Sequence, residues 1–173
     1  VERGTLELGK YLSGQGHESI VVSNGGRMVE QLNLEGTRHI RMPVHSKSPT
    51  SLLQVLELRK LFLHEKPDIV HARSRVPAWL AFIALKLISN SQRPKFVTTV
   101  HGFYSVNAYS KIMTRGDHVI CVSNSVKNYV LKNYPETSQE KISIIYRGLK
   151  SSNFNFGYRP NKEWLHKWNK DFP

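Results

Sequence analysis

Residues 95–107 read KFVTTVHGFYSVN, a short apolar run that ends in a His-Gly pair and continues into an aromatic, polar stretch. Phe96 to Val100 are aromatic and β-branched, the composition of a strand that is covered on both faces, as in a parallel sheet. Ligands of such sheets bind beyond the carboxyl ends of the strands. His101 stands at that end, and Gly102 beside it lets backbone or ligand approach closely. We therefore expect the chemistry of the chain at this loop.

Strands and helices are predicted to alternate on both sides of this loop. Short β-branched or aromatic runs predict further strands, at residues 17–23, 38–44, 68–72, 117–122 and 141–146. Apolar residues at helical spacing predict helices that alternate with these strands. Three of them are predicted at residues 2–15, 27–34 and 77–89. A fourth is predicted from the loop at 46–50 to Pro67, and a fifth from the N-cap Ser123 to Tyr134. This alternation predicts a doubly wound α/β fold with a parallel sheet.

The chain of 173 residues is strongly basic, with 25 Lys and Arg against 13 Asp and Glu and a formal net charge of +12. Its length suits one ordinary domain with a buried core. The charge favours an anionic partner, which is nucleic acid, an anionic lipid surface or a phosphorylated small molecule. Because the basic residues are scattered and no nucleic-acid-binding motif accompanies them, we expect no specific recognition of nucleic acid.

No transmembrane helix is predicted, since the longest apolar run, 78–85, is far shorter than the roughly 20 residues that cross a bilayer. The one cysteine, Cys121, lies in an apolar run, which favours a small buried side chain and a reducing compartment. We therefore expect a cytoplasmic protein, and peripheral contact with an anionic membrane stays open. The helical pattern opens at Val1 with no strand before it, so we expect that a preceding segment is missing.

His101 is the leading candidate for chemistry. A histidine at a strand end either donates a hydrogen bond to a ligand hydroxyl or phosphate, moves a proton, or is structural. Arg73 and Arg75 follow the strand at 68–72 and are placed to reach the same cleft, where guanidinium groups bind anions by forked hydrogen bonds; the alternative is that they only solvate a loop. Ser123 is either an ordinary N-cap or holds a phosphate with the helix N-terminus.

Other motifs exclude several kinds of site. The turn at Asn24, Gly25 and Gly26 lacks the G-x-G-x-x-G spacing of a dinucleotide site, and the P-loop motif is absent. None of the eight histidines belongs to an H-E-x-x-H motif, and one cysteine builds no thiolate cluster, so we expect no bound metal. His71 lies inside a predicted strand, where a structural histidine bonded to the backbone is favoured over a ligand-binding one.

The segments VERGTLELGKYLSGQGHESIVVS, KPDIVHARS, TTVHG, VICVSNSV and KISIIYRG stand in an order that resembles the amino-terminal domain of family 4 glycosyltransferases. The resemblance covers residues 1–150 and implies a Rossmann-like half of a GT-B fold that lacks its first strand and the second domain. Residues 151–173 then form a connector towards that missing carboxyl-terminal, donor-binding domain. Relatives carry Asn-Gly-Val-Asp after the last strand, where this chain has Arg147-Gly148-Leu149-Lys150.

The resemblance also implies roles for individual residues. His101 matches the histidine near the donor sugar in the cleft, Gly102 matches its neighbour, and Arg73 becomes a contact of the acceptor or of a phosphate. Glu2 and Arg3 stand at the tail of a glycine-rich loop that precedes the first helix in the family. The expected catalytic residue is His101, and the expected substrate-binding residues are Gly102, Arg73, Arg75, Phe103, Tyr104, Glu2, Arg3 and Ser123.

The function implied is that of the acceptor-side domain of a retaining glycosyltransferase. Such an enzyme needs no metal and no cofactor, and moves a sugar from a nucleotide-sugar donor to an anionic, lipid-linked envelope glycan such as lipopolysaccharide. Without the second domain, we expect little activity from this chain. The alternative is a noncatalytic module that binds a phosphorylated ligand or an anionic membrane surface in the same cleft.

Overall fold

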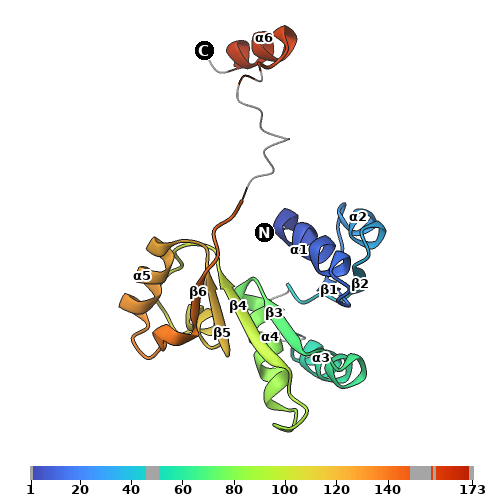
Figure 1. The fold of residues 1–173 in the computed structure, drawn as a ribbon, viewed down its shortest axis with the longest axis vertical. Helices are drawn as coiled ribbons and strands as arrows, with labels where there is room; N and C mark the ends of the chain where they lie inside the picture. Colours follow the sequence, from blue (N-terminus) through green and yellow to red (C-terminus); the bar gives the residue numbers. More distant parts are fainter. Residues whose placement is uncertain (1, 46–50, 149–156, 158, 172–173) are drawn as a thin grey trace.

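The computed structural model describes residues 2–45, 51–148, 157 and 159–171 (Figure 1). The predicted loop at 46–50 and parts of the predicted connector, 151–156, 158 and 172–173, lie outside the described residues. The elements follow in the order α1 (Glu2–Gly14), β1 (Ile20–Ser23), α2 (Val29–Leu34), β2 (Arg38–Arg41), α3 (Ser51–Glu65), β3 (Ile69–Ala72), α4 (Arg75–Lys86), β4 (Lys95–Val100), η1 (Ser110–Thr114), β5 (His118–Cys121), α5 (Asn124–Asn133), η2 (Gln139–Lys141), β6 (Ile142–Ile144) and α6 (Lys162–Asp171).

The alternation of strands and helices is confirmed, and the differences lie at the element ends. Strand β4 begins one residue before the predicted start at Phe96. Each of the other predicted strands contains the observed one but is longer, because the flanking residues leave the hydrogen-bonded ladders. Helix α4 begins at Arg75, two residues before the predicted start, after the extended residue Ser74. Pro77 therefore lies in the first helical turn, where its missing N–H breaks no hydrogen bond.

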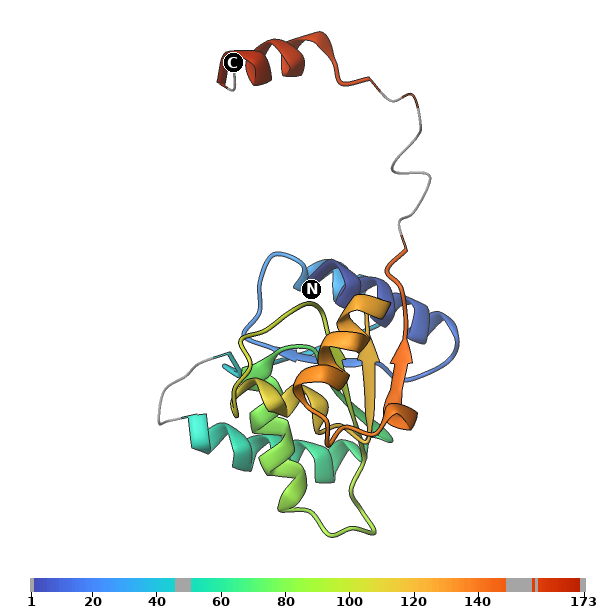
Figure 2. The ribbon, with the colours of Figure 1, turned by 90° about the vertical axis from the view of Figure 1, so that its left-hand side faces the viewer.

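The strands form two parallel sheets in the described chain. The larger sheet has the order β3-β4-β5-β6, and the smaller one pairs β1 with β2. No hydrogen-bonded ladder joins β1 to β3. In the Rossmann strand order 3-2-1-4-5-6, the first strand lies between the second and the fourth, which is the position between β1 and β3 here. Right-handed crossovers put α4 and α5 on the same face of the larger sheet, and Figure 2 shows α5 in front of the strands. The predicted Rossmann-like α/β fold is confirmed.

Strand β4 lies inside the larger sheet and is covered on both faces, as predicted. The side chains of successive residues in a strand point to opposite faces, so Phe96, Thr98 and Val100 share one face and Thr99 lies on the other. All four residues are at most 4% exposed. The Thr98 hydroxyl donates a 2.7 Å hydrogen bond to the carbonyl oxygen of Met113, so this buried polar group is satisfied. The core under β4 therefore holds its carboxyl end, and the loop beyond it, in one position.

The apolar core extends from β4 to its neighbours on both sides. Helix α4 buries Ala78, Ala84 and Leu85 against it, in agreement with the nearly all-apolar sequence of that helix. Cys121 at the end of β5 is buried, as expected for a small apolar side chain, and burial raises the pKa of its thiol to about 11. The thiol is therefore uncharged at neutral pH and unreactive.

The connector contains a helix that the sequence reasoning missed. Asn161 accepts a 2.7 Å hydrogen bond from the N–H of Trp164, which is the capping signal that begins α6. All residues of α6 are exposed, and the rings of Trp164 and Trp168 stack at 5.1 Å. Among the described residues, no helix combines the length and the apolar character that crossing a membrane requires.

Candidate functional site

The carboxyl ends of the strands in the larger sheet bring four polar residues to one edge. Arg73 directly follows β3, His101 follows β4, Ser123 stands two residues beyond β5, and Arg147 stands three residues beyond β6. Since neighbouring parallel strands end side by side, residues far apart in the sequence become neighbours here. This edge is the candidate functional site.

Two contacts hold His101, one to its backbone and one to its ring. Its backbone N–H points to the hydroxyl of Tyr104 at 3.4 Å, and the Nη2 group of Arg147 lies 2.5 Å from its Nδ1 atom. The other ring nitrogen, Nε2, is buried and has no hydrogen-bond partner among the described residues. A buried polar atom left without a partner is costly in a folded protein, and such atoms often mark a site that a ligand completes.

The surroundings of His101 disfavour its protonated form. Burial, and then the positive charges of Arg147 and Arg73, lower the pKa of His101 to about 4. At neutral pH the imidazole is therefore uncharged, with one nitrogen that donates and one that accepts a hydrogen bond.

Arg73 connects this edge to the first helix. Its Nη1 group donates a 3.1 Å hydrogen bond to the carbonyl oxygen of Gly4 in α1, while its Nε atom is buried without a partner in the described part of the chain. Burial, and then the charge of Arg147, lower the pKa of Arg73. No carboxylate forms an ion pair with Arg73 or Arg147 among the described residues, so the edge carries uncompensated positive charge.

His71 supports the site from inside the sheet. Its Nε2 atom lies 2.7 Å from the hydroxyl of the buried Thr99, so it is structural, as predicted, but its partner is a side chain rather than the backbone. Burial lowers the pKa of His71 to about 4, and the charge of Arg73 acts in the same direction. His71 thus stays neutral beneath the arginine.

Arg75 and Tyr104 brace the loop that follows β4. The Arg75 guanidinium lies 5.0 Å from the ring centre of Tyr104 and 5.1 Å from that of Tyr109, and it donates a 3.1 Å hydrogen bond to the hydroxyl of Ser110. The arginine is thereby directed towards two tyrosines, and Tyr104 in turn contacts His101. A substrate contact for Arg75 and Tyr104 stays a prediction.

Other predicted residues lie around this centre. Phe103 is 67% exposed and packs one side of its ring 5.2 Å from that of Tyr129. Gly102 faces open space, since a Cβ atom there would meet nothing within 4 Å, so a ligand has room to approach. The Ser123 hydroxyl accepts a 3.2 Å hydrogen bond from the N–H of Val126, which confirms its N-cap role.

Glu2 and Arg3 occupy the exposed first turn of α1. Arg3 forms a 3.2 Å ion pair with Glu7, one turn further along the helix. The carbonyl oxygen of Gly4, in the same turn, accepts a hydrogen bond from the predicted site residue Arg73. Substrate contacts for Glu2 and Arg3 stay predictions.

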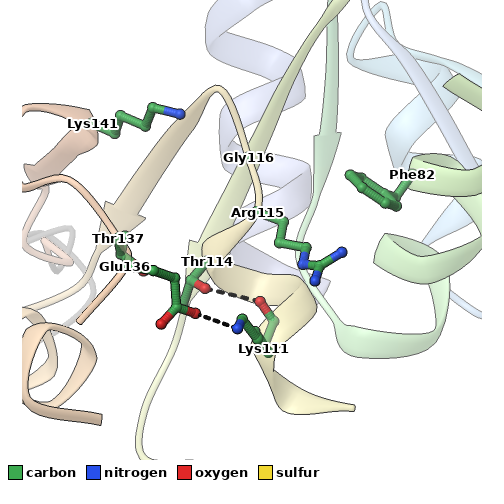
Figure 3. A pocket seen from close by; sticks show the side chains of 8 residues that line it. All are labelled: Phe82, Lys111, Thr114, Arg115, Gly116, Glu136, Thr137 and Lys141. Carbon is green, nitrogen blue, oxygen red and sulfur yellow. Dashed lines mark hydrogen bonds and ion pairs between the residues drawn. The ribbon is translucent and has the colours of Figure 1, made fainter. Parts of the chain in front are cut away.

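A cavity of about 350 Å³ opens at the opposite, amino-terminal ends of β5 and β6, where none of the predicted site residues lies (Figure 3). Lys111 and Glu136 face each other across it in a 2.7 Å ion pair, and Arg115 lies 5.7 Å from the ring centre of Phe82. The remaining residues that line this cavity are Thr114, Gly116, Thr137 and Lys141.

Comparison with known proteins identifies the family of the chain. The profile described as Glycosyltransferase Family 4 matches residues 1–152, which is most of the chain. The chain belongs to this family. No curated protein matches it at a significant level.

Solved structures of glycosyltransferases share the fold. A glycosyltransferase from Rickettsia africae ESF-5 is 37% identical, with a TM-score of 0.76 over 100% of this chain and 46% of that one. Anabaena Alr3699/HepE, solved with UDP and glucose, is 14% identical, with a TM-score of 0.65 over 96% of this chain and 46% of that one. The lipopolysaccharide outer core galactosyltransferase WaaB is 16% identical, with a TM-score of 0.62 over 84% of this chain and 40% of that one. This family 4 chain thus spans less than half of each of these proteins.

The family 4 domain brings together His101 and Arg73, as predicted, and adds Arg147, which the sequence reasoning noted only as a departure from relatives. The position of Arg147 just after a strand of the parallel sheet was the signal that could have found it. Among the described residues, no group of three His, Cys, Asp or Glu side chains stands close enough together to hold a metal ion.

Proposed function

We propose that this chain is the acceptor-side half of a retaining glycosyltransferase that transfers a sugar from a nucleotide-sugar donor to an anionic, lipid-linked envelope glycan. One observation carries the proposal. Arg73, Arg147 and the neutral His101 meet at one sheet edge with no carboxylate paired to either arginine in the described chain, and with buried polar atoms that lack partners. This arrangement suits an anionic ligand.

The chemistry of glycosyl transfer needs such an edge. Negative charge develops on the leaving diphosphate, and preorganised donors stabilise it in the transition state. A guanidinium group offers fixed donors that match phosphate oxygens, and a neutral imidazole offers one N–H to a sugar hydroxyl or a phosphate oxygen. The nucleotide-sugar donor is proposed by analogy with HepE, whose structure holds UDP and glucose, and the envelope glycan by analogy with WaaB.

The chain spans 46% of the Rickettsia africae protein, so we propose that the other half of the cleft comes from a second domain. The isolated 173 residues are then expected to transfer no measurable sugar. A chimera that fuses the chain to the carboxyl-terminal half of the Rickettsia africae protein tests this, with labelled nucleotide sugars as donors and lipid-linked glycans as acceptors.

Transfer by the chimera is expected to fall about 100-fold in His101→Ala, because a preorganised donor is lost from the site. The exposed His17, in the turn after α1, provides the matched control, and His17→Ala is expected to leave transfer unchanged. Transfer by the isolated chain, or full activity of the His101→Ala chimera, contradicts the proposal.

A second candidate function is noncatalytic binding to an anionic membrane surface, and helix α6 favours it. Trp164, Leu165 and Trp168 are 50%, 39% and 48% exposed, and the same helix carries Lys162, Lys167 and Lys170. Exposed tryptophans with lysines beside them are typical of helices that lie in the membrane interface.

Cosedimentation with vesicles distinguishes this candidate. Binding is expected to vesicles of phosphatidylglycerol and to be lost in the Trp164→Ala, Trp168→Ala double variant and with neutral phosphatidylcholine. Tyr11, 64% exposed on α1, offers a control aromatic residue outside α6. If the double variant binds vesicles as well as Tyr11→Ala does, helix α6 does not bind the membrane.

A further inference from the structure

We infer that Arg147 is a positioning residue of the site, which decides the ring nitrogen of His101 that carries the proton. The inference rests on the proposed function for the identity of the ligand, but its geometry is independent of that identity. It assigns a role to a residue that follows β6 and that lies 46 positions from His101 in the sequence.

The hydrogen-bonding capacity of the two groups fixes their roles in this contact. A guanidinium group donates hydrogen bonds and accepts none. The Nη2 group of Arg147 lies 2.5 Å from Nδ1 of His101, so Nδ1 must be the acceptor in this contact. The proton of the neutral ring then resides on Nε2. The contact also excludes the doubly protonated imidazolium, in which both nitrogens carry a proton.

The contact with Arg147 leaves the second ring nitrogen of His101, Nε2, to face a ligand. Nε2 of His101 is buried and finds no partner among the described residues. In the tautomer that Arg147 selects, this atom is a donor, and it requires an acceptor atom such as a phosphate oxygen or a sugar hydroxyl. His101 therefore acts on its ligand as a neutral hydrogen-bond donor rather than as a charged acid.

Other groups also act on the His101 ring. Arg73 from the end of β3 and His71 from within β3 both disfavour a positive charge on His101, and the Tyr104 hydroxyl contacts its backbone. Arg73 and His71 lower the affinity of the ring for a second proton, but only Arg147 contacts a ring nitrogen among the described residues. Removing Arg147 therefore removes the selection of the tautomer and leaves the other neighbours in place.

Nitrogen-15 spectra of the full chain with labelled histidine test this inference, because the two ring nitrogens differ in chemical shift when one is protonated. The His101 signals are assigned by their loss in His101→Gln. We expect the wild-type spectrum at pH 7 to show Nε2 protonated and Nδ1 unprotonated, with no titration until the pH falls well below 6. A protonated Nδ1 in the wild-type protein would overturn the inference.

Two variants separate the hydrogen bond from the charge. Arg147→Gln keeps an N–H donor and removes the charge, so we expect the tautomer to persist while the pKa of His101 rises towards the ordinary histidine value of about 6.5. Arg147→Ala removes both, so we expect a mixture of tautomers and a raised pKa. Since Arg147 is exposed, both variants should fold, which the backbone amide spectrum checks.

Lys141 provides a matched control, because it stands at the other end of the same strand and is exposed. Lys141→Gln removes one positive charge and is expected to leave the His101 signals unchanged. Identical His101 spectra in the wild-type protein and Arg147→Ala would overturn the inference, as would loss of the tautomer in Lys141→Gln. No donor or acceptor sugar enters this experiment, so failure of sugar transfer and failure of the Arg147 role are separate results.

Discussion

Replacing His71 by glutamine should make the stability of the domain less sensitive to acid. His71 lies in β3, and its Nε2 atom contacts the hydroxyl of the buried Thr99 at 2.7 Å. Burial is the main cause that lowers the pKa of His71 to about 4 from an ordinary value of 6.5. The glutamine amide can also hydrogen-bond to the threonine hydroxyl, but it does not titrate.

The size of the effect follows from the difference between the folded and unfolded proteins. Between pH 6.5 and pH 4 the unfolded chain takes up a proton on His71 that the folded protein does not, so the free energy of unfolding falls as the pH falls. The two pKa values differ by about 2.5, and each pKa unit corresponds to about 1.4 kcal/mol. Protonation of His71 should therefore remove about 3 kcal/mol of stability between pH 7 and pH 4.

Urea unfolding of the wild-type protein and His71→Gln at pH 7, 6, 5 and 4 measures this difference. Carboxylates also lose stabilising contacts in acid, but they do so equally in both proteins, so the difference between the two curves isolates His71. His17→Gln, at an exposed position, serves as the control and should follow the wild-type curve. Parallel curves for the wild-type protein and His71→Gln would refute the reasoning.

Three other substitutions test the core, the turn and the helix cap by chemical denaturation. Ile112→Ala removes a fully buried side chain and should cost about 3 kcal/mol; a loss below 1 kcal/mol would mean that the site collapses around the smaller residue. Gly116→Ala should cost about 2 kcal/mol, because the new Cβ atom would lie 2.6 Å from the carbonyl oxygen of His118, and an unchanged midpoint would contradict the close contact. Ser123→Ala removes the acceptor for the N–H of Val126 and should cost about 1 kcal/mol, whereas Ser123→Asp, another good N-cap residue, should restore it.

The parts of the fold that followed from the sequence are those set by local composition. Phe96 to Val100 could be placed in a buried strand because β-branched and aromatic residues suit a sheet that is covered on both faces. His101 and Arg73 could then be placed at one edge, since parallel strands end together. These inferences need only the direction and the order of the strands.

The contacts that could not be predicted from the sequence depend on the directions in which side chains point in the folded chain. Arg75 stands two residues from Arg73, yet it packs between two tyrosines, because α4 begins at Arg75 and directs its side chain towards η1. The position of Arg147 after a strand could have placed it at the same edge, but its contact with His101 depends also on the order of the strands, which no local pattern near residue 147 contains. Helix α6 was missed because its aromatic residues resembled those of an irregular connector.

The division between the two sheets has a consequence for the dynamics of the molecule. A two-stranded ribbon is marginally stable by itself, whereas a sheet of four strands with a covered face resists opening. Backbone amides of β1 and β2 should therefore exchange with deuterium sooner than those of β4. Arg73 donates a hydrogen bond to the carbonyl oxygen of Gly4 in α1. Transient separation of α1, β1 and β2 from the larger sheet would therefore break this hydrogen bond of Arg73 and leave the contact of His101 with Arg147 in place.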